Sequence, residues 1–348
     1  MPTYNRARFL HDAFESISAQ TFTDWELIVV DDGSTDNTRE LVNKLSATVA
    51  QPVRFIYQAN QGPAGARNAG LAVALSEYVA FLDSDDCWLP HHLHDCIQSL
   101  DANPDVDWVY GADRRVDHAT GRVLTENSFR QADRLYPCMN IHTRLSGRLH
   151  IIDDPRAVCC AILHDYYCGF QKSVFRSRVF SRLRIPPYRV GEDQAFVVLA
   201  MKEGYRLGYL DDVHLEYHVH DGNLSATTLS GAVDKKVDGF RELIRAFEEL
   251  PTRVVLNGDE RRALRKRLSR DYFWHLGYGL LWQHGRRQEA LETYRRAIRL
   301  WPWSLACWKT YLLAALRTRL GKAADQDKVE GMLGRSVPEN VDHGTLRK

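Results

Sequence analysis

Residues 25–34 read WELIVVDDGS, and residues 78–86 read YVAFLDSDD. Each stretch begins with a short apolar run, which predicts a buried β-strand, and continues at once into aspartates. Helical signals follow both strands, because Ser34 can cap a helix that reaches about Leu45, and Pro90 opens another helix. Strands that alternate with helices of this length predict an α/β fold with a mostly parallel, doubly wound sheet.

The same alternation extends outward from these two stretches. We expect further helices at 7–20 and 63–75, further strands at 53–57 and 106–110, and a hairpin over 113–126 with its turn at Thr120-Gly121. The pattern loosens up to residue 190, and helical periodicity returns after Glu192. We therefore predict a catalytic domain over 1–230, a helical extension over 231–323 and a polar, flexible tail over 324–348.

Composition excludes several classes of protein. Among 348 residues, 46 Lys and Arg balance 45 Asp and Glu, so no net charge attracts nucleic acid. The hydrophobic share of 44% excludes wholesale disorder. No apolar run approaches the roughly 20 residues that span a bilayer, and the first residues lack a signal-peptide pattern. The seven cysteines include no CxxC pair, and we interpret Cys159, Cys160 and Cys168 as structural thiols. A cytoplasmic protein is expected.

Carboxylates stand at both strand ends, where ligands bind in sheets of this kind. Asp31 and Asp32 favour hydrogen bonds to the base or ribose of a nucleotide, although an aspartate there can also cap the next helix. Asp83, Asp85 and Asp86 repel one another, which favours a divalent cation that offsets the repulsion. The alternative for the second cluster is a solvated turn.

Three more segments supply candidate site residues. Arg67 follows the glycine-containing run 60–66 and could pair with a diphosphate or hold an aspartate; a helix that merely packs on the sheet is the alternative. Glu192 and Asp193 open a helix and could provide a general base, although the helix dipole alone also favours acids there. His218 and His220 would share one face of a strand and could reach a metal or a phosphate.

In order along the chain, these segments resemble the family-2 inverting glycosyltransferases with the GT-A fold. The resemblance covers about residues 1 to 225, and it rests on PTYNR at 2–6, DDGS at 31–34, QG at 61–62, RN at 67–68, DSDD at 83–86, ED at 192–193 and YHVH at 217–220. The family normally has an apolar first strand before PTYN, and here Met1 stands where that strand should end. We expect the true start to lie upstream of Met1.

The resemblance implies a role for each matching position. Pro2 and Tyr4 would contact the nucleotide, with Tyr4 stacked on its base, and Asp32 would bind that base. Arg67 would support the nucleotide pocket and Asp83 would contact the ribose. Asp85 and His220 would bind Mn²⁺ or Mg²⁺ on the diphosphate. Asp193 would be the catalytic base, with Glu192 supporting it.

The implied activity is metal-assisted, inverting transfer of a sugar from a nucleotide-diphospho-sugar, UDP-linked, to a hydroxyl of a cell-envelope glycan or glycolipid. Two alternatives stay open: a truncated, non-catalytic homologue that acts as a binding module, and nucleotidyl transfer on a similar fold. The second is disfavoured because residues 62–70 lack a basic phosphate loop.

The C-terminal third has a repeat-like pattern. The spacing of Trp274, Ala290, Tyr294, Ala297 and Pro302 resembles a tetratricopeptide helix pair, and Trp308 follows Trp274 by one period. This pair could pack on the first domain or form an independent peptide-binding module. The aromatic and basic residues near its end could also contact the inner face of a membrane; they are Trp301, Trp303, Trp308, Tyr311, Arg317, Arg319 and Lys322.

Overall fold

The computed structural model describes residues 1–131, 134–136, 139, 141–164, 166, 169–223 and 233–320. The chain forms two compact units, Met1–His220 and Asp221–Lys348. The predicted domain boundary at 230 and the predicted tail 324–348 both lie outside the described residues.

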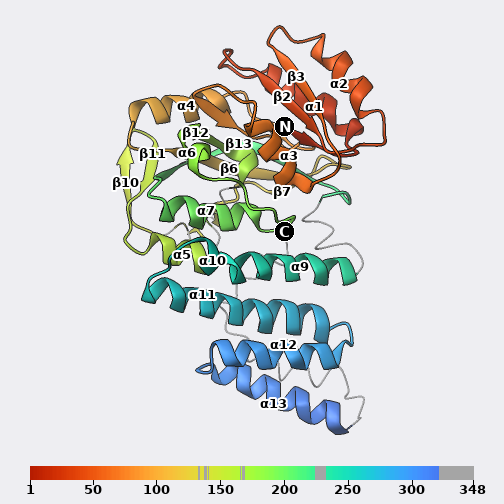
Figure 1. Ribbon diagram of the computed structural model, residues 1–348, viewed down its shortest axis with the longest axis vertical. Helices are drawn as coiled ribbons and strands as arrows, with labels where there is room; N and C mark the ends of the chain where they lie inside the picture. The colour runs from red at the N-terminus through yellow and green to blue at the C-terminus, as the bar shows by residue number, and fades with distance from the viewer. Residues whose placement is uncertain are drawn as a thin grey trace. The chain divides into compact units, whose positions relative to one another are not determined.

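The first unit begins with a three-stranded parallel sheet, drawn in red and orange in Figure 1. Its order is β1 (Pro2–Thr3), β2 (Leu27–Asp31) and β3 (Val53–Tyr57). The expected short first strand is therefore two residues long, and the predicted strand 53–57 has the predicted bounds. The connecting helices are α1 (Ala7–Ser18), α2 (Thr38–Ser46) and α3 (Gly62–Leu71).

Helix α1 shows why the apolar spacing predicted it. Phe9, Leu10, Ala13, Phe14 and Ile17 are all buried, so one face of the helix enters the core. Helix α3 contains small residues on its sheet side: a Cβ on Gly70 would lie 3.4 Å from the Val30 side chain. Close packing of α3 on β2 brings the start of α3 next to the end of that strand.

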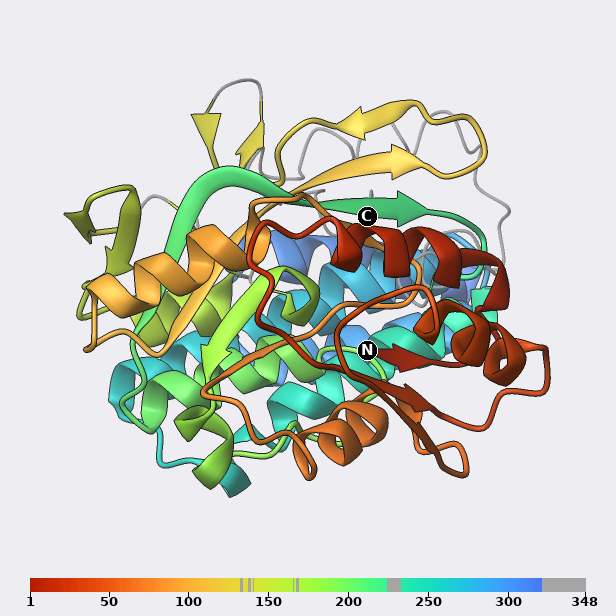
Figure 2. The same cartoon turned by 90° about the horizontal axis from the view of Figure 1, so that it is seen from above.

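The second sheet contains eight strands and mixes parallel with antiparallel pairs. Its main order is β10 (Thr143–Ser146), β11 (Leu149–Ile152), β13 (Leu207–Val219), β6 (Trp108–Asp117), β12 (Ser173–Arg176) and β4 (Tyr78–Ala80). Figure 2 shows β13 as a long curved green strand, which pairs in parallel with β6. The strand β12 enters antiparallel between β6 and β4, an insertion that the sequence pattern did not predict.

Shorter elements complete this unit. Strand β5 (Cys87–Trp88) pairs with β13, and β7 (Val123–Thr125) pairs with β6 across Thr120-Gly121, which confirms the predicted hairpin. The remaining elements are β8 (Arg130–Gln131), β9 (Arg134–Leu135), α4 (His92–Ala102), α5 (Ala157–Leu163), a 3-10 turn η2 (Phe170–Lys172), α6 (Arg178–Arg182) and α7 (Glu192–Lys202). Helix α7 is buried along most of its length, because apolar residues occupy every position from Ala195 to Met201.

Every described secondary-structure element of the second unit is a helix, as predicted. It contains α9 (Val233–Glu248), α10 (Leu250–Arg253), α11 (Gly258–Arg270), a π-helix η3 (Asp271–Trp282), α12 (Arg287–Leu300) and α13 (Leu305–Leu320). The rings of Phe273 and Tyr294 stack at 4.3 Å, so η3 and α12 pack as a hairpin. Whether this hairpin is a tetratricopeptide repeat stays a prediction. Among the described helices, none combines the length and the apolar character that crossing a membrane requires.

Candidate active site

The end of β2 is built around the buried carboxylate of Asp32. Its Oδ1 accepts hydrogen bonds from the Gln61 backbone N–H at 2.8 Å and from Gln58 Nε2 at 2.7 Å, and its Oδ2 accepts from the Gly62 N–H at 2.8 Å. These amides open α3, where N–H groups have no partner within the helix. Asp32 therefore fixes the start of α3 at the end of β2.

The segment 2–6 is tied to the same strand end. The Asp32 N–H donates to the Thr3 carbonyl at 2.9 Å, and Asn5 Oδ1 accepts from the Thr35 N–H at 2.8 Å. Pro2 lies in β1 opposite Val30, whereas the Tyr4 side chain is exposed beside this junction, with 44% of its surface accessible. The first two motifs, far apart in the sequence, thus form one edge of the site.

Arg67 connects three segments of the first unit. Its Nη2 donates to Asp83 Oδ1 at 2.6 Å and its Nη1 donates to Glu192 Oε1 at 2.9 Å. The guanidinium lies over the Phe170 ring at 5.2 Å, and only 5% of the side chain is exposed. A buried arginine needs such charged partners. The acidic end of β4 and the acidic start of α7 are therefore held together by one side chain.

Asp85 lies in a second group of charged residues. Its Oδ2 accepts from Arg6 Nε at 3.1 Å and contacts His220 Nε2 at 3.2 Å. The His220 ring stacks on Phe9 at 4.3 Å. The structure thus brings together the two residues predicted to bind metal. His218 is placed differently: its backbone N–H donates to Asp86 Oδ1 at 3.0 Å, and its ring lies 5.4 Å from that of His118.

The carboxyl groups of this cluster differ in protonation. Burial opposes ionisation of Asp85, but the hydrogen bond to His220 and the charge of Arg6 outweigh it and lower its pKa. Burial, together with the charges of Asp85 and Asp83, raises the pKa of Asp86 well above its ordinary value. Asp86 Oδ2 is buried without a hydrogen-bond partner among the described residues. Of these two neighbouring acids, Asp85 is therefore the ionised one.

The start of α7 presents two acids in different surroundings. Gly191 adopts a φ of +84°, and Glu192 and Asp193 follow in the first turn. Burial, reinforced by the charge of Asp193, raises the pKa of Glu192 to about 8 despite the opposing charge of Arg67. Asp193 is only half-buried, and its Oδ1 accepts from the Gln194 N–H at 2.8 Å. The more accessible acid at this helix start is Asp193.

Sequence reasoning missed three residues of the site. Arg6 and Phe9 contact Asp85 and His220 respectively, and the His118 ring lies 6.0 Å from that of His220. Arg6 is the last residue of the PTYNR segment, so its place in that motif was a usable signal. Phe9 belongs to the apolar face of α1 and His118 to the β6–β7 turn, and neither carries a motif that marks a site.

Comparisons with known proteins agree with this geometry. Residues 1–180 match the family model described as Glycosyl transferase family 2. The succinoglycan biosynthesis protein ExoO of Rhizobium meliloti (strain 1021) is 29% identical over 272 residues, which cover 76% of this chain and 70% of that protein. The Nostoc uncharacterized glycosyltransferase alr2836 is 43% identical over 36% of this chain, and the match spans only 41% of that relative's length.

One further relative has a described reaction, and solved structures share the fold. The Escherichia coli UDP-Glc:alpha-D-GlcNAc-diphosphoundecaprenol beta-1,3-glucosyltransferase WfgD is 38% identical over 32% of this chain and 43% of its own length. S. aureus TarS in complex with UDP-GlcNAc has a TM-score of 0.59 at 19% identity, covering 93% of this chain and 91% of that chain. The mannosyltransferase PcManGT from Pyrobaculum calidifontis, in complex with GDP-Man and Mn²⁺, has a TM-score of 0.56 at 19% identity, covering 96% and 82%.

Proposed function

This chain belongs to glycosyl transferase family 2 and is a glycosyltransferase. We propose that it transfers a sugar from a UDP-linked donor to a hydroxyl of a cell-envelope glycan or glycolipid. The transfer would invert the configuration at the anomeric carbon. The observation that carries the proposal is the Arg67 bridge. Because Arg67 bonds both Asp83 and Glu192, the acidic end of β4 is held next to the start of α7, where Asp193, the acid proposed as base, follows Glu192.

The nucleotide would lie along the ends of β1, β2 and β4. Tyr4 offers an exposed ring on which a base can stack, and Pro2 and Asp32 lie at the same junction. Asp83 would contact the ribose of the nucleotide-sugar through carboxylate lone pairs that its bond to Arg67 leaves available. A UDP donor is supported by the UDP-Glc in the name of the Escherichia coli relative and by the UDP-GlcNAc bound to S. aureus TarS.

A divalent cation fits the residues at the end of β4. Asp85 would supply an ionised oxygen, which both Mn²⁺ and Mg²⁺ bind, and His220 an imidazole nitrogen 3.2 Å from that oxygen, which Mn²⁺ accepts more readily than Mg²⁺. When bound, such an ion stabilises the negative charge that develops on a departing diphosphate. Phe9 holds the His220 ring in place, and Arg6 supplies a further positive charge beside Asp85.

Asp193 would perform the proton transfer. Its carboxylate takes the proton of the acceptor hydroxyl as the acceptor oxygen bonds to the anomeric carbon from one face. The bond from that carbon to the diphosphate oxygen breaks on the opposite face, and the nucleoside diphosphate leaves with the bonding electrons. A single displacement of this kind inverts the configuration. Glu192, which keeps its proton at neutral pH, leaves Asp193 as the anionic base.

The acceptor class rests on the relatives' names, which mention succinoglycan biosynthesis and a diphosphoundecaprenol acceptor. Contact with a membrane surface that holds such a lipid would use the last described helix. Trp303 and Leu305 are 80% and 85% exposed, and Leu312 and Leu316 continue the apolar face of α13. Arg319's side chain and Lys322 lie outside the part of the chain that the structure describes.

Titration calorimetry with UDP, in the presence and absence of Mn²⁺, tests the proposal. We expect binding that requires the ion and that is lost in Asp85→Ala. The matched control is Asp24→Ala, because Asp24 is exposed and lies before β2, away from the strand ends. Binding by wild type and control only would support the donor site and justify a screen of UDP-sugars. Absence of binding by folded wild type, with dTDP and GDP also tried, would favour the non-catalytic alternative.

A further inference from the structure

A second group of metal-ligating side chains lies at the start of α4, away from Asp85 and His220. His92, Cys96 and His214 are each buried with 0% of their surface accessible. One ligand atom of each lies within 4.8 Å of the others. His92 and Cys96 are one turn apart on α4, and His214 belongs to β13. We propose that these three side chains bind a structural Zn²⁺ that ties α4 to β13.

The distances between the ligand atoms suit a tetrahedral ion. The Nδ1 atoms of His92 and His214 are 3.4 Å apart, and Cys96 Sγ lies 3.8 Å from His92 Nδ1. Zn–N bonds of about 2.0–2.1 Å and Zn–S bonds of about 2.3 Å place tetrahedral ligand atoms roughly 3.3–3.6 Å apart. The two distances from His92 Nδ1 would change by only a few tenths of an ångström on coordination. The third pair, Cys96 and His214, lies within 4.8 Å and would close by up to about 1 Å.

The two imidazoles have lone pairs that the protein does not otherwise use well. The rings of His92 and His214 are fully buried, and their Nδ1 atoms face each other. At 3.4 Å the facing Nδ1 atoms can share only one proton, and both Nε2 atoms are buried with no hydrogen-bond partner in the described part of the chain. A cation bound to both Nδ1 atoms uses both lone pairs and leaves the proton of each ring on Nε2.

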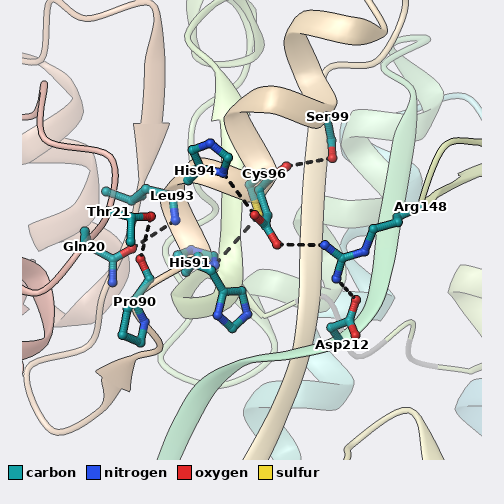
Figure 3. Close-up of polar contacts among 12 residues, drawn as sticks. Gln20, Thr21, Pro90, His91, Leu93, His94, Cys96, Ser99, Arg148 and Asp212 are labelled. Carbon is teal, nitrogen blue, oxygen red and sulfur yellow. Dashed lines mark hydrogen bonds and ion pairs between the residues drawn. The ribbon is translucent and has the colours of Figure 1, made fainter.

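The backbone around the cluster already holds the ligands in place. A Cβ on Gly111 of β6 would lie 2.2 Å from His214 Cδ2, so the imidazole occupies space that only glycine leaves open. The Leu89 N–H donates to the His214 carbonyl at 3.0 Å, and the Leu93 N–H donates to Gln20 Oε1 at 3.0 Å. Figure 3 shows Gln20, Thr21, Pro90 and Leu93 around the start of α4, with His91 directly before the helix and Cys96 on it.

The chemistry of this group favours zinc over the harder ions that carboxylates bind. Two imidazoles and a thiolate bind Zn²⁺ more tightly than they bind Mg²⁺ or Mn²⁺. His91 and Asp95 form an adjoining set with His214, so either could supply the fourth ligand. Cys96 would bind zinc as a thiolate, so the thiol proton is released to solvent as the S–Zn bond forms.

Metal analysis of the full chain, purified without added metal and then exchanged against excess zinc, is the first test. We expect one zinc per chain that survives dialysis. Cys96→Ala should weaken zinc binding by at least about 100-fold. The matched control is Cys307→Ala, which removes another buried cysteine, in the second unit. Asp85→Ala should keep the zinc, which separates this site from the donor site.

The spectrum of the cobalt-substituted wild-type chain gives a readout that does not depend on whether the variants fold. A thiolate-to-cobalt charge-transfer band and tetrahedral ligand-field bands are expected, and the band should disappear in Cys96→Ala but persist in Cys307→Ala. Removing the metal should lower Tm by roughly 5–10 °C. A chain that takes up no zinc, a cobalt spectrum without the thiolate band, or zinc uptake that Cys96→Ala leaves unchanged would each overturn the proposal.

Discussion

The two acidic strand ends of the first unit look alike in sequence but differ in how their carboxylates are satisfied. After β2, Asp32 accepts from two backbone amides and one glutamine. After β4, Asp83 and Asp85 are paired with the side chains of Arg67, Arg6 and His220. The helix fixes the direction of the backbone N–H groups at its start, whereas side chains can rotate and exchange one hydrogen-bond partner for another. The first strand end is thus built as a fixed support, and the second can accept a ligand.

The largest expected effect comes from the second strand end. Asp85→Asn removes the ionised oxygen proposed to bind the cation, so kcat/KM with a UDP-sugar and Mn²⁺ should fall by about 10³-fold. The free energy of unfolding should change by no more than about 1 kcal/mol, because loss of the bonds to Arg6 and His220 is offset by the lower cost of burying a neutral amide in place of a carboxylate. Steady-state kinetics and urea unfolding measure the two quantities. A comparable loss of activity in the control Asp24→Asn would show that the effect of Asp85→Asn is not specific to the end of β4.

The first strand end should show the reverse pattern. Asp32→Asn replaces one acceptor oxygen by an NH₂ group that faces an N–H donor, either that of Gln61 or that of Gly62. Leaving buried donors unpaired should lower the free energy of unfolding by about 2–3 kcal/mol. Urea unfolding of the variant beside Asp85→Asn gives the measurement. If Asp32→Asn unfolds at the wild-type midpoint but loses UDP binding, Asp32 is a ligand group and the assignment as a fixed support is wrong.

The sequence predicted the elements of this region better than their partners. Apolar runs marked β2 and β3 because the strands are short and bounded by turn residues, and the helical face of α1 was recognisable from Phe9 to Ile17. It did not predict that β12 enters antiparallel between β4 and β6, because strand pairing over such separations leaves no local pattern. The Arg67 bridge and the His92–Cys96–His214 group likewise depend on segments that meet only in the folded chain.

A pair of glycine variants sharpens the description of the first strand end. Gly33 and Gly62 both have positive φ, at +86° and +79°, so alanine is strained at either position. A Cβ at Gly33 would lie 3.1 Å from the Asn60 backbone nitrogen, whereas at Gly62 the nearest atom is a flexible Arg189 carbon at 3.7 Å. Gly33→Ala should cost about 1–2 kcal/mol of unfolding free energy, and Gly62→Ala about 1 kcal/mol. Equal losses of unfolding free energy in the two variants would mean that the turn after β2 can shift to relieve the contact with Asn60.

The smallest effect on activity is expected at Glu192, which faces the second strand end through Arg67. Because its carboxyl keeps a proton at neutral pH, Glu192→Gln resembles the protonated side chain and can still accept from Arg67. We expect kcat/KM within about threefold of wild type at pH 7. Glu192→Ala is the matched variant that removes the acceptor, and it should destabilise the buried Arg67.

Stability against pH distinguishes a protonated Glu192 from an ionised one. Its folded-state pKa of about 8 lies above the ordinary 4.5, so between these values the native state binds more protons than the unfolded state. The contribution of this group is therefore complete below pH 4.5 and is lost as the pH rises through about 8, by up to roughly 1.4 kcal/mol per pH unit. Glu192→Gln should remove that slope, measured as the difference between variant and wild type in urea unfolding. A variant that is less stable than wild type by the same amount at every pH above 4.5 would show instead that Glu192 is an ionised partner of Arg67.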